Sequence, residues 1–363
     1  MHKRSALAAV AVGLTMAFAL PTGALAATKQ VYMGTPPSAQ KTFQEKYGID
    51  VNDFFPHTIS VHVGDSVRFV PSGFHTVDFP PKGEEDLPVF APTGQTVAGA
   101  TDALGNPFWF NGQNQLGFNP QLANPNTSLF GKRVTYNGKD RVETGIPAGQ
   151  KPKPATIRFT KTGTFNYVCD VHPGMKGTVR VLSRSETVRG VKSDAKVVRQ
   201  MIARDLAVGK QLPQTKVAAG AVDVGEAGRF GVEYFDFLPK KLTVPIGTTV
   251  SFQMTKLSRE VHTATTGPGD PEKDPSSYLG KLVASLQAPA PDPAALYPSD
   301  QPGTPASLTP QLHGNGFWNS GVIDNEESTP PPFGNSVRFD AAGTYEFYCL
   351  IHPFMHGTVT VTG

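Results

Sequence analysis

Two loops in this 363-residue chain carry the same set of side chains that bind soft metal ions. In each loop a cysteine is followed by a histidine three residues later and by a methionine three residues after that. An alternating, β-type segment precedes each cysteine, and a Gly-Thr-Val segment follows each methionine. The residues are Cys169, His172 and Met175 in the first loop and Cys349, His352 and Met355 in the second.

A thiolate, an imidazole and a thioether are three of the four ligands of a blue-copper centre, which exchanges single electrons. We expect the fourth ligand to be a histidine far upstream, where an early strand ends. His75 follows the strand expected at residues 66–70, and His262 follows the one at 249–254. The predicted metal ligands are therefore His75, Cys169, His172 and Met175 in one half and His262, Cys349, His352 and Met355 in the other.

Two alternatives compete with copper at these positions. In exported proteins, cysteines usually form disulfides. The chain has only two cysteines, so Cys169 and Cys349 could pair with each other. A disulfide, however, needs neither a histidine nor a methionine at a fixed spacing. Zinc is the other competitor, but a structural zinc site favours further cysteine or histidine over methionine.

The N-terminal residues have the pattern of a secretory signal peptide, expected at residues 1–26. Basic residues at positions 2–4 precede an apolar run, and Ala24 and Ala26 fit a small-x-small cleavage site. We therefore expect an exported protein, secreted or in the cell envelope or periplasm, without a transmembrane segment. The formal net charge of +3 is too mild to suggest nucleic-acid binding.

The strands and the internal repeat position the ligands. Short alternating runs divided by turn signals predict β-sandwiches, and segments near residues 59–69 and 157–165 recur near 242–252 and 337–345. We predict a first domain at 27–182 with a long insertion at 80–153, and a second domain at 217–363 with an insertion at 267–332. Residues 288–305, rich in proline and alanine, are expected to be flexible. Between the domains lies a basic linker, 183–216, in which residues 194–208 predict an amphipathic helix.

On these motifs the chain resembles the cupredoxin (plastocyanin/azurin-like) family, and its Cys-x2-His-x2-Met spacing is similar to the short loop of amicyanin-like members. The resemblance covers roughly residues 55–80, 155–182, 236–265 and 335–363. It implies an all-β fold of two tandem Greek-key β-sandwich domains joined by a helical linker, with two type 1 copper ions per chain. The family usually has asparagine after the upstream histidine, whereas this chain has Thr76 and Thr263. That departure affects hydrogen bonding around the ligands and hence the reduction potential.

Three functions are compatible with this sequence. The favoured one is an electron carrier that uses redox partner proteins and has no catalytic residue of its own. A copper-dependent oxidase or nitrite reductase would need further histidines, for example for an extra inter-subunit copper. The histidines not assigned to the two sites or to residues 1–26 are His57, His62, His313 and His356, and they form no His-x-His pair. A copper-binding or storage protein is the third possibility, although the chain has no methionine-rich tract. The oligomeric state and the partners stay open.

Overall fold

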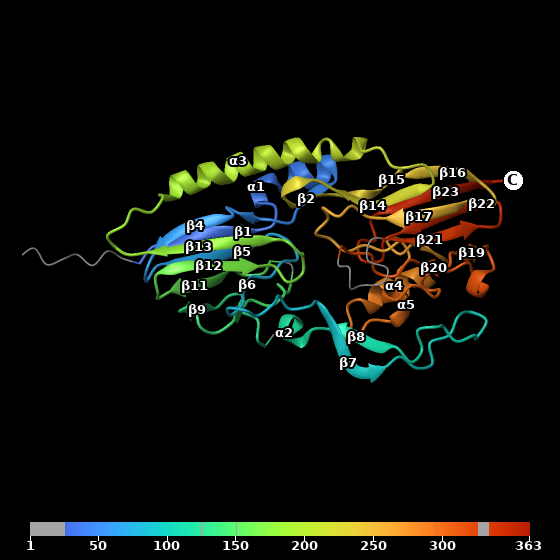
Figure 1. Cartoon of the computed structure of the whole chain (residues 1–363), viewed down its shortest axis with the longest axis horizontal. Helices are drawn as coiled ribbons and strands as arrows, with labels where there is room; N and C mark the ends of the chain where they lie inside the picture. The colour runs from blue at the N-terminus through green and yellow to red at the C-terminus, as the bar shows by residue number, and fades with distance from the viewer. Residues whose placement is uncertain (1–25, 125, 150, 326–333) are drawn as a thin grey trace, which may run out of the picture.

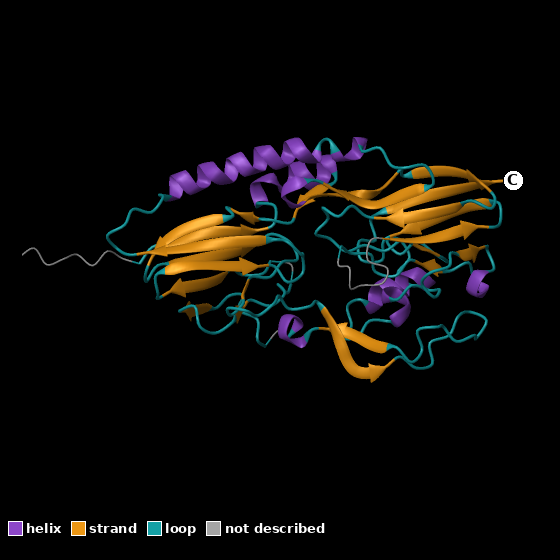
Figure 2. Cartoon of the chain, in the orientation of Figure 1, coloured by secondary structure: helices purple, strands orange, loops and turns teal. Residues whose placement is uncertain are grey.

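The computed structural model describes residues 26–124, 126–149, 151–325 and 334–363. Strands form most of its regular structure, arranged as two β-sandwiches that lie side by side (Figures 1 and 2). This confirms the predicted fold class, all-β with sandwich domains joined by a helix. The expected signal peptide lies outside the described residues except for Ala26, and so do residues 326–333 of the second insertion.

The first sandwich consists of two five-stranded sheets. One sheet has the order β3 (Phe54–Phe55), β1 (Thr28–Met33), β5 (Ser66–Pro71), β11 (Ala155–Phe159), β9 (Arg133–Tyr136). The other has the order β10 (Val142–Glu143), β6 (Asp78–Phe79), β12 (Gly163–Val168), β13 (Lys176–Leu182), β4 (Thr58–His62). Alternate residues of β4 and β13 are buried, as expected for strands with one face on a core.

The second sandwich packs a six-stranded sheet against a five-stranded sheet. The larger sheet has the order β19 (Ala306–Leu308), β21 (Gly334–Phe339), β17 (Thr249–Gln253), β14 (Ala221–Ala227), β15 (Val232–Leu238), β2 (Ile49–Val51). The smaller has the order β16 (Lys241–Pro245), β23 (His356–Thr362), β22 (Gly343–Tyr348), β18 (Thr265–Thr266), β20 (Trp318–Asn319). The outermost strand of the larger sheet, β2, comes from the N-terminal part of the chain, so the two sandwiches share chain segments.

The two sandwiches have the same strand order. The series β1-β5-β11-β9 corresponds to β14-β17-β21-β19, and β4-β13-β12-β6-β10 corresponds to β16-β23-β22-β18-β20. Each has its own apolar core, and each core contains one cysteine and one methionine of the ligand loops: Cys169 and Met175 in one, Cys349 and Met355 in the other. The predicted ligands thus occupy equivalent positions.

A long helix, α3 (Val191–Gly209), runs along one side of the first sandwich and ends at the near edge of the second, close to β15 (Figure 1). It contains residues 194–208, where the sequence predicted a helix. Its apolar stripe, which includes Met201 and Ile202, packs on Ile49, Val51 and Val232 near the shared strand β2. At its start Asp194 forms a buried ion pair with Lys29 of β1 at 2.8 Å. The helix is therefore fixed to both halves of the chain.

The two insertions meet on the opposite side of the molecule, where the hairpin β7 (Phe90–Thr96) and β8 (Asn114–Phe118) extends from the first sandwich toward the second (Figure 1). Phe110 of this arm packs with Leu279 and Ala295 of the second insertion. The prediction that residues 288–305 are flexible is wrong, because helix α5 (Pro293–Leu296) is buried under the arm.

The other helical segments are short. They are α1 (Pro37–Gln40), the π-helical η1 (Lys41–Lys46), α2 (Pro120–Ala123), η2 (Leu212–Gln214), η3 (Arg229–Gly231), α4 (Tyr278–Ser285) and η4 (Leu312–Gly314). Within the described ranges, none of the helices combines the length and the apolar character needed to cross a bilayer.

Candidate metal centres

The two ligand loops are closed by the same pair of backbone hydrogen bonds. After β12, the Cys169 N–H donates to the Met175 carbonyl at 3.0 Å, and the Met175 N–H donates to the His172 carbonyl at 3.0 Å. After β22, the corresponding bonds measure 3.1 Å for Cys349 and 2.8 Å for Met355. Each loop therefore folds back on itself, and the cysteine and the methionine enter the core together.

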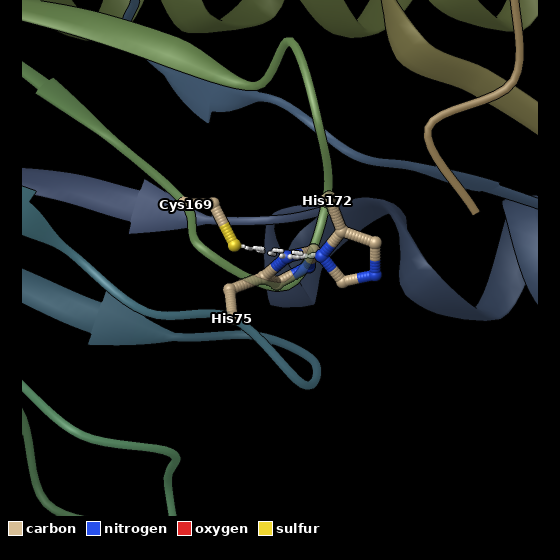
Figure 3. Close-up of side chains that lie close together, drawn as sticks. All are labelled: His75, Cys169 and His172. Atoms are coloured by element: carbon tan, nitrogen blue, oxygen red, sulfur yellow. Dashed lines mark hydrogen bonds between the residues drawn. The ribbon is translucent and has the colours of Figure 1, made fainter. Parts of the chain in front are cut away.

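The upstream histidines reach the same points from the other edge of each sandwich. His75 lies between β5 and β6, and its Nδ1 is 2.9 Å from Nδ1 of His172 and 3.9 Å from Sγ of Cys169 (Figure 3). The Cys169 Sγ is 3.5 Å from His172 Nδ1. These three side chains point toward one another, so both rings present Nδ1 to the thiol.

The second cluster has the same arrangement. Sγ of Cys349 is 3.8 Å from Nδ1 of His262 and 3.8 Å from Nδ1 of His352, and the two ring nitrogens are 3.3 Å apart. In each cluster the three ligand atoms lie within 4.8 Å of one another. The structure thus brings together the predicted His, Cys and His of each half, and it places the predicted methionine fully buried in the same core.

These clusters fit a small, soft metal ion. Bonds of ~2.0–2.3 Å from one ion to nitrogen and sulfur ligands place the ligand atoms roughly 3.3–3.8 Å apart, close to the separations given above. Both cysteines are free and buried, so the alternative of a Cys169–Cys349 disulfide is wrong. A histidine pair and a thiol, with a methionine in the same core, suit copper better than a hard cation that prefers oxygen.

Glycine backbone covers the outer edge of each upstream histidine. A Cβ atom at Gly34 would lie 2.4 Å from Nε2 of His75, and one at Gly225 would lie 2.5 Å from Nε2 of His262. Both glycines have positive φ, 94° and 78°. A side chain at either position would therefore clash with the ring and would also strain the backbone. No motif in the sequence pointed to these two glycines.

The threonines that follow the upstream histidines hold the ligand loops. The hydroxyl of Thr76 accepts a hydrogen bond from the Asp170 N–H at 2.8 Å, and that of Thr263 accepts one from the Leu350 N–H at 2.8 Å. Their backbone N–H groups point at the cysteine sulfurs, at 3.4 Å in both clusters. The hydroxyl thus ties the residue after each cysteine to the upstream strand end.

Charge in the second cluster favours a deprotonated Cys349. Burial alone would raise the pKa of the Cys349 thiol, but its contacts with His262 and His352 lower that pKa well below its usual range. Burial alone would lower the pKa of His172, yet the Glu260 carboxylate and the Cys169 sulfur raise it to about 10. A thiolate is the form that binds copper, so the second cluster is electrostatically prepared for it.

The unassigned histidines lie elsewhere, each with partners of its own. His57 pairs with Asp53, and His62 contacts the Glu186 carbonyl. His313 lies between Asp102 and Asp300, and His356 packs near Tyr348. Among the described residues, the two His-Cys-His groups are the only side-chain clusters that could hold a metal ion.

Sequence reasoning missed one charged residue at the sites. Glu260 precedes His262 by two positions, and its carboxylate lies 3.2 Å from Nε2 of His172 in the other sandwich. At the equivalent position the first half has Gly73, so comparison of the repeats gave no signal. Only the way the two sandwiches face each other reveals the contact.

Comparison with known proteins finds matches among solved structures alone. No protein-family model matches the chain, and no curated protein matches it. Solved structures that match include oxidised plastocyanin from Dryopteris crassirhizoma (22% identity, TM-score 0.20, 39% of this chain and 99% of that one) and a reduced mutant of amicyanin (18% identity, TM-score 0.20, 40% and 87%). A mutant fern plastocyanin matches at 20% identity and a TM-score of 0.21. The resemblance to cupredoxins is thus found again among solved structures. With TM-scores of 0.20 and 0.21 these matches carry no argument, so copper and function are inferred from the chain's own side chains.

Proposed function

We propose that the chain is a blue-copper protein that relays single electrons through two type 1 copper sites. The observation that carries this proposal is the pair of equivalent clusters, in which two Nδ1 atoms and one sulfur converge, each in a core that also contains a fully buried methionine. Copper supplies the one-electron couple when bound. The proposed ligands are His75, Cys169, His172 and Met175, and His262, Cys349, His352 and Met355.

The protein's own part is to hold these ligands still. The backbone bonds within each loop, the threonine hydroxyls and the glycines over the upstream rings all limit movement of the side chains. A donor set that changes little between the two oxidation states keeps the reorganisation small, and this speeds electron transfer. Burial also excludes water from the sulfurs, because the Cys169 residue is 2% exposed and the Cys349 residue 0%.

We further infer that the protein is exported and that the two sandwiches arose as a tandem repeat. The signal-like residues 1–26 support export, and the matching strand orders support the repeat. The proposed location is the cell envelope, the periplasm or the outside of the cell, with redox proteins as partners. N-terminal sequencing of the exported protein tests the cleavage site after Ala26.

Copper counting tests the function most directly. The full chain loaded with Cu(II) should bind two copper ions and show an intense thiolate charge-transfer band. Cys169→Ser and Cys349→Ser should each remove one ion and about half of the band, and the double variant should remove both. A colourless loaded protein would contradict the proposal. Three or more copper ions per chain, with an EPR signal of a second copper type, would point to an oxidase or reductase instead.

A further inference from the structure

One carboxylate lies between a proposed copper ligand of the first sandwich and one of the second. Oε1 of Glu260 lies 3.2 Å from Nε2 of His172, and Oε2 of the same residue lies 3.6 Å from Nε2 of His352. The Glu260 side chain is only 8% exposed. One carboxyl group therefore lies between a metal-binding ring of each sandwich, with one oxygen toward each.

The other nitrogen of each ring faces its own cluster. Nδ1 of His172 is directed at Cys169 and His75, and Nδ1 of His352 is directed at Cys349 and His262. The order of groups is therefore first cluster, His172, Glu260, His352, second cluster, without a gap wide enough for another side chain. The two histidines also line one cleft between the sandwiches, together with Phe74 and Phe354.

The bridging carboxylate is also held by the chain segment that connects the two sandwiches, between β2 and β3. Asn52, next to the shared strand β2, donates its side-chain N–H to Oε1 of Glu260 at 2.8 Å. Asn52 is itself fixed, because its backbone N–H donates to the Gly231 carbonyl at 2.7 Å and its carbonyl accepts from Arg259 Nη1 at 2.6 Å. Gly73 occupies the equivalent position beside His75, so a single carboxylate serves both sites.

A plain structural ion pair is the competing explanation for Glu260. An ion pair would account for the contact with His172. A carboxylate that only joined the two domains, however, would not need to contact a proposed copper ligand in each of them.

The two rings that Glu260 contacts differ in exposure: the His172 side chain is 6% exposed and that of His352 is 19%. Phe354, beside His352, is 54% exposed. Between the two rings that Glu260 contacts, His352 is therefore the more accessible from outside.

We propose that Glu260 is the bridge through which electrons pass between the two sites, and that electrons enter and leave at the His352 side. This inference rests on the proposed function. In each transfer one electron leaves Cu(I) at one site, which becomes Cu(II), and reduces Cu(II) at the other site to Cu(I). The ring N–H groups keep their protons and the carboxylate stays ionised, so no further reactant is needed.

Stopped-flow reduction by hexaammineruthenium(II) tests both parts of the proposal: that electrons enter at the His352 side, and that they pass between the sites through Glu260. In the Cu(II)-loaded wild type, both halves of the blue band should bleach in one fast phase. In Cys169→Ser, the remaining second site should be reduced fast. In Cys349→Ser, the remaining first site should be reduced slowly, because electrons reach the first site through the second. Glu260→Ala should split the wild-type phase, with half of the amplitude slowed ~10-fold or more. Glu260→Gln, which keeps one acceptor oxygen, should fall between.

Glu233→Gln is the matched control. Glu233 is also buried, but it accepts hydrogen bonds from Ser258 and Arg259 and not from the ligand rings. Burial raises the pKa of Glu233 to about 8, so glutamine resembles its protonated form at neutral pH. This variant should keep the single fast phase. Thermal unfolding of each variant shows whether it is folded. If Glu260→Ala does not fold, Glu260→Gln takes its place in the test.

A second measurement does not depend on electron flow. In the Cu(I)-loaded, diamagnetic protein, the His172 ring N–H should give a slowly exchanging NMR signal that Glu260→Ala loses and Glu233→Gln keeps. The bridge is refuted if Glu260→Ala keeps the single fast phase, or if Cys349→Ser bleaches as fast as Cys169→Ser. Two type 1 coppers with such results would leave the proposed function intact, whereas absence of the blue band would overturn both.

Discussion

At the scale of single residues, the threonines that follow the upstream histidines form the hydrogen bonds that connect each ligand loop to the upstream strand. The cupredoxin resemblance implies an asparagine at these two positions, and this chain has threonine instead. Thr263 in fact accepts from the N–H of Leu350, a residue without exposed surface, and thereby connects the strand end to the ligand loop. Thr76 makes the equivalent bond with Asp170 and also contacts that side chain at 2.8 Å.

Thr263→Val should therefore weaken the second site and leave the first unchanged. Valine keeps the shape of threonine but cannot accept the Leu350 N–H, and an unsatisfied buried donor costs about 1–3 kcal/mol. We expect a lower unfolding free energy by that amount and a changed reduction potential for one of the two coppers. Chemical denaturation and spectroelectrochemical titration measure the two effects. Thr263→Ser, which restores the hydroxyl, should behave like the wild type; an unchanged Thr263→Val would show that the hydroxyl is dispensable.

At the scale of elements, the long insertions dock on each other instead of acting as loose covers. Trp109 donates its ring N–H to the Pro298 carbonyl at 2.8 Å, and the Tyr297 hydroxyl donates to the Asn114 carbonyl at 2.6 Å. His313 adds a charged contact, with Nδ1 3.6 Å from Asp102 and Nε2 3.3 Å from Asp300. The arm of the first insertion is thus joined to the second by aromatic packing, hydrogen bonds and an ion pair.

The His313 contact should make the stability of this junction depend on pH. Burial alone would lower the pKa of His313, but its contacts with Asp300 and Asp102 raise it overall. A raised pKa means that the stabilisation is fully present below the unfolded value of ~6.5 and disappears as the pH rises through the folded pKa. His313→Asn should cost ~1 kcal/mol at pH 5.5 and progressively less at higher pH.

Urea denaturation of the wild type and of His313→Asn across this pH range measures the difference. Asparagine is the appropriate replacement because His313 has a φ of 53°, a left-handed conformation that asparagine tolerates. Asp300→Asn should show a similar pH trend. A difference between wild type and variant that grows with pH would contradict the assignment.

At the scale of the whole molecule, three connections fix the sandwiches so that their histidine edges face each other. Helix α3 runs along one side, the insertion arm spans the other, and strand β2 crosses between them to join the second sandwich. Such multiple tethers differ from a pair of domains on a flexible linker, whose relative motion is the ordinary expectation. Fixed domains keep Glu260 within reach of both rings.

Phe110→Ala tests the contribution of the arm. Phe110 has no exposed surface, and removal of a buried aromatic ring costs about 3–5 kcal/mol. We expect a lower unfolding temperature and faster proteolysis within residues 97–118, with both blue bands retained because the ligands lie elsewhere. Leu104→Ala, in the same arm but 70% exposed, is the control and should change little. Equal protease resistance of Phe110→Ala and wild type would show that the arm is held by other contacts.

The sequence by itself determined the fold class and predicted the residues that meet in the two clusters. The spacing of Cys169, His172 and Met175 is local, so one tight loop brings the three together whatever the rest of the chain does. The repeat then marked His75 and His262 as partners, because equivalent strand ends meet equivalent loops. The alternation of apolar residues predicted sandwiches, since one face of each strand has to be buried.

Only the tertiary structure decided what lies between the two sites. Glu260 belongs to the second sandwich by sequence, but it contacts His172 of the first, and Asn52 of the N-terminal segment holds it. Residues 288–305 were expected to be flexible because their composition is that of a loop, yet α5 is ordered by aromatic side chains of a distant insertion. In both cases the deciding contacts join segments far apart in the chain. Periodicity and spacing report which face of an element is buried, but not which partner buries it.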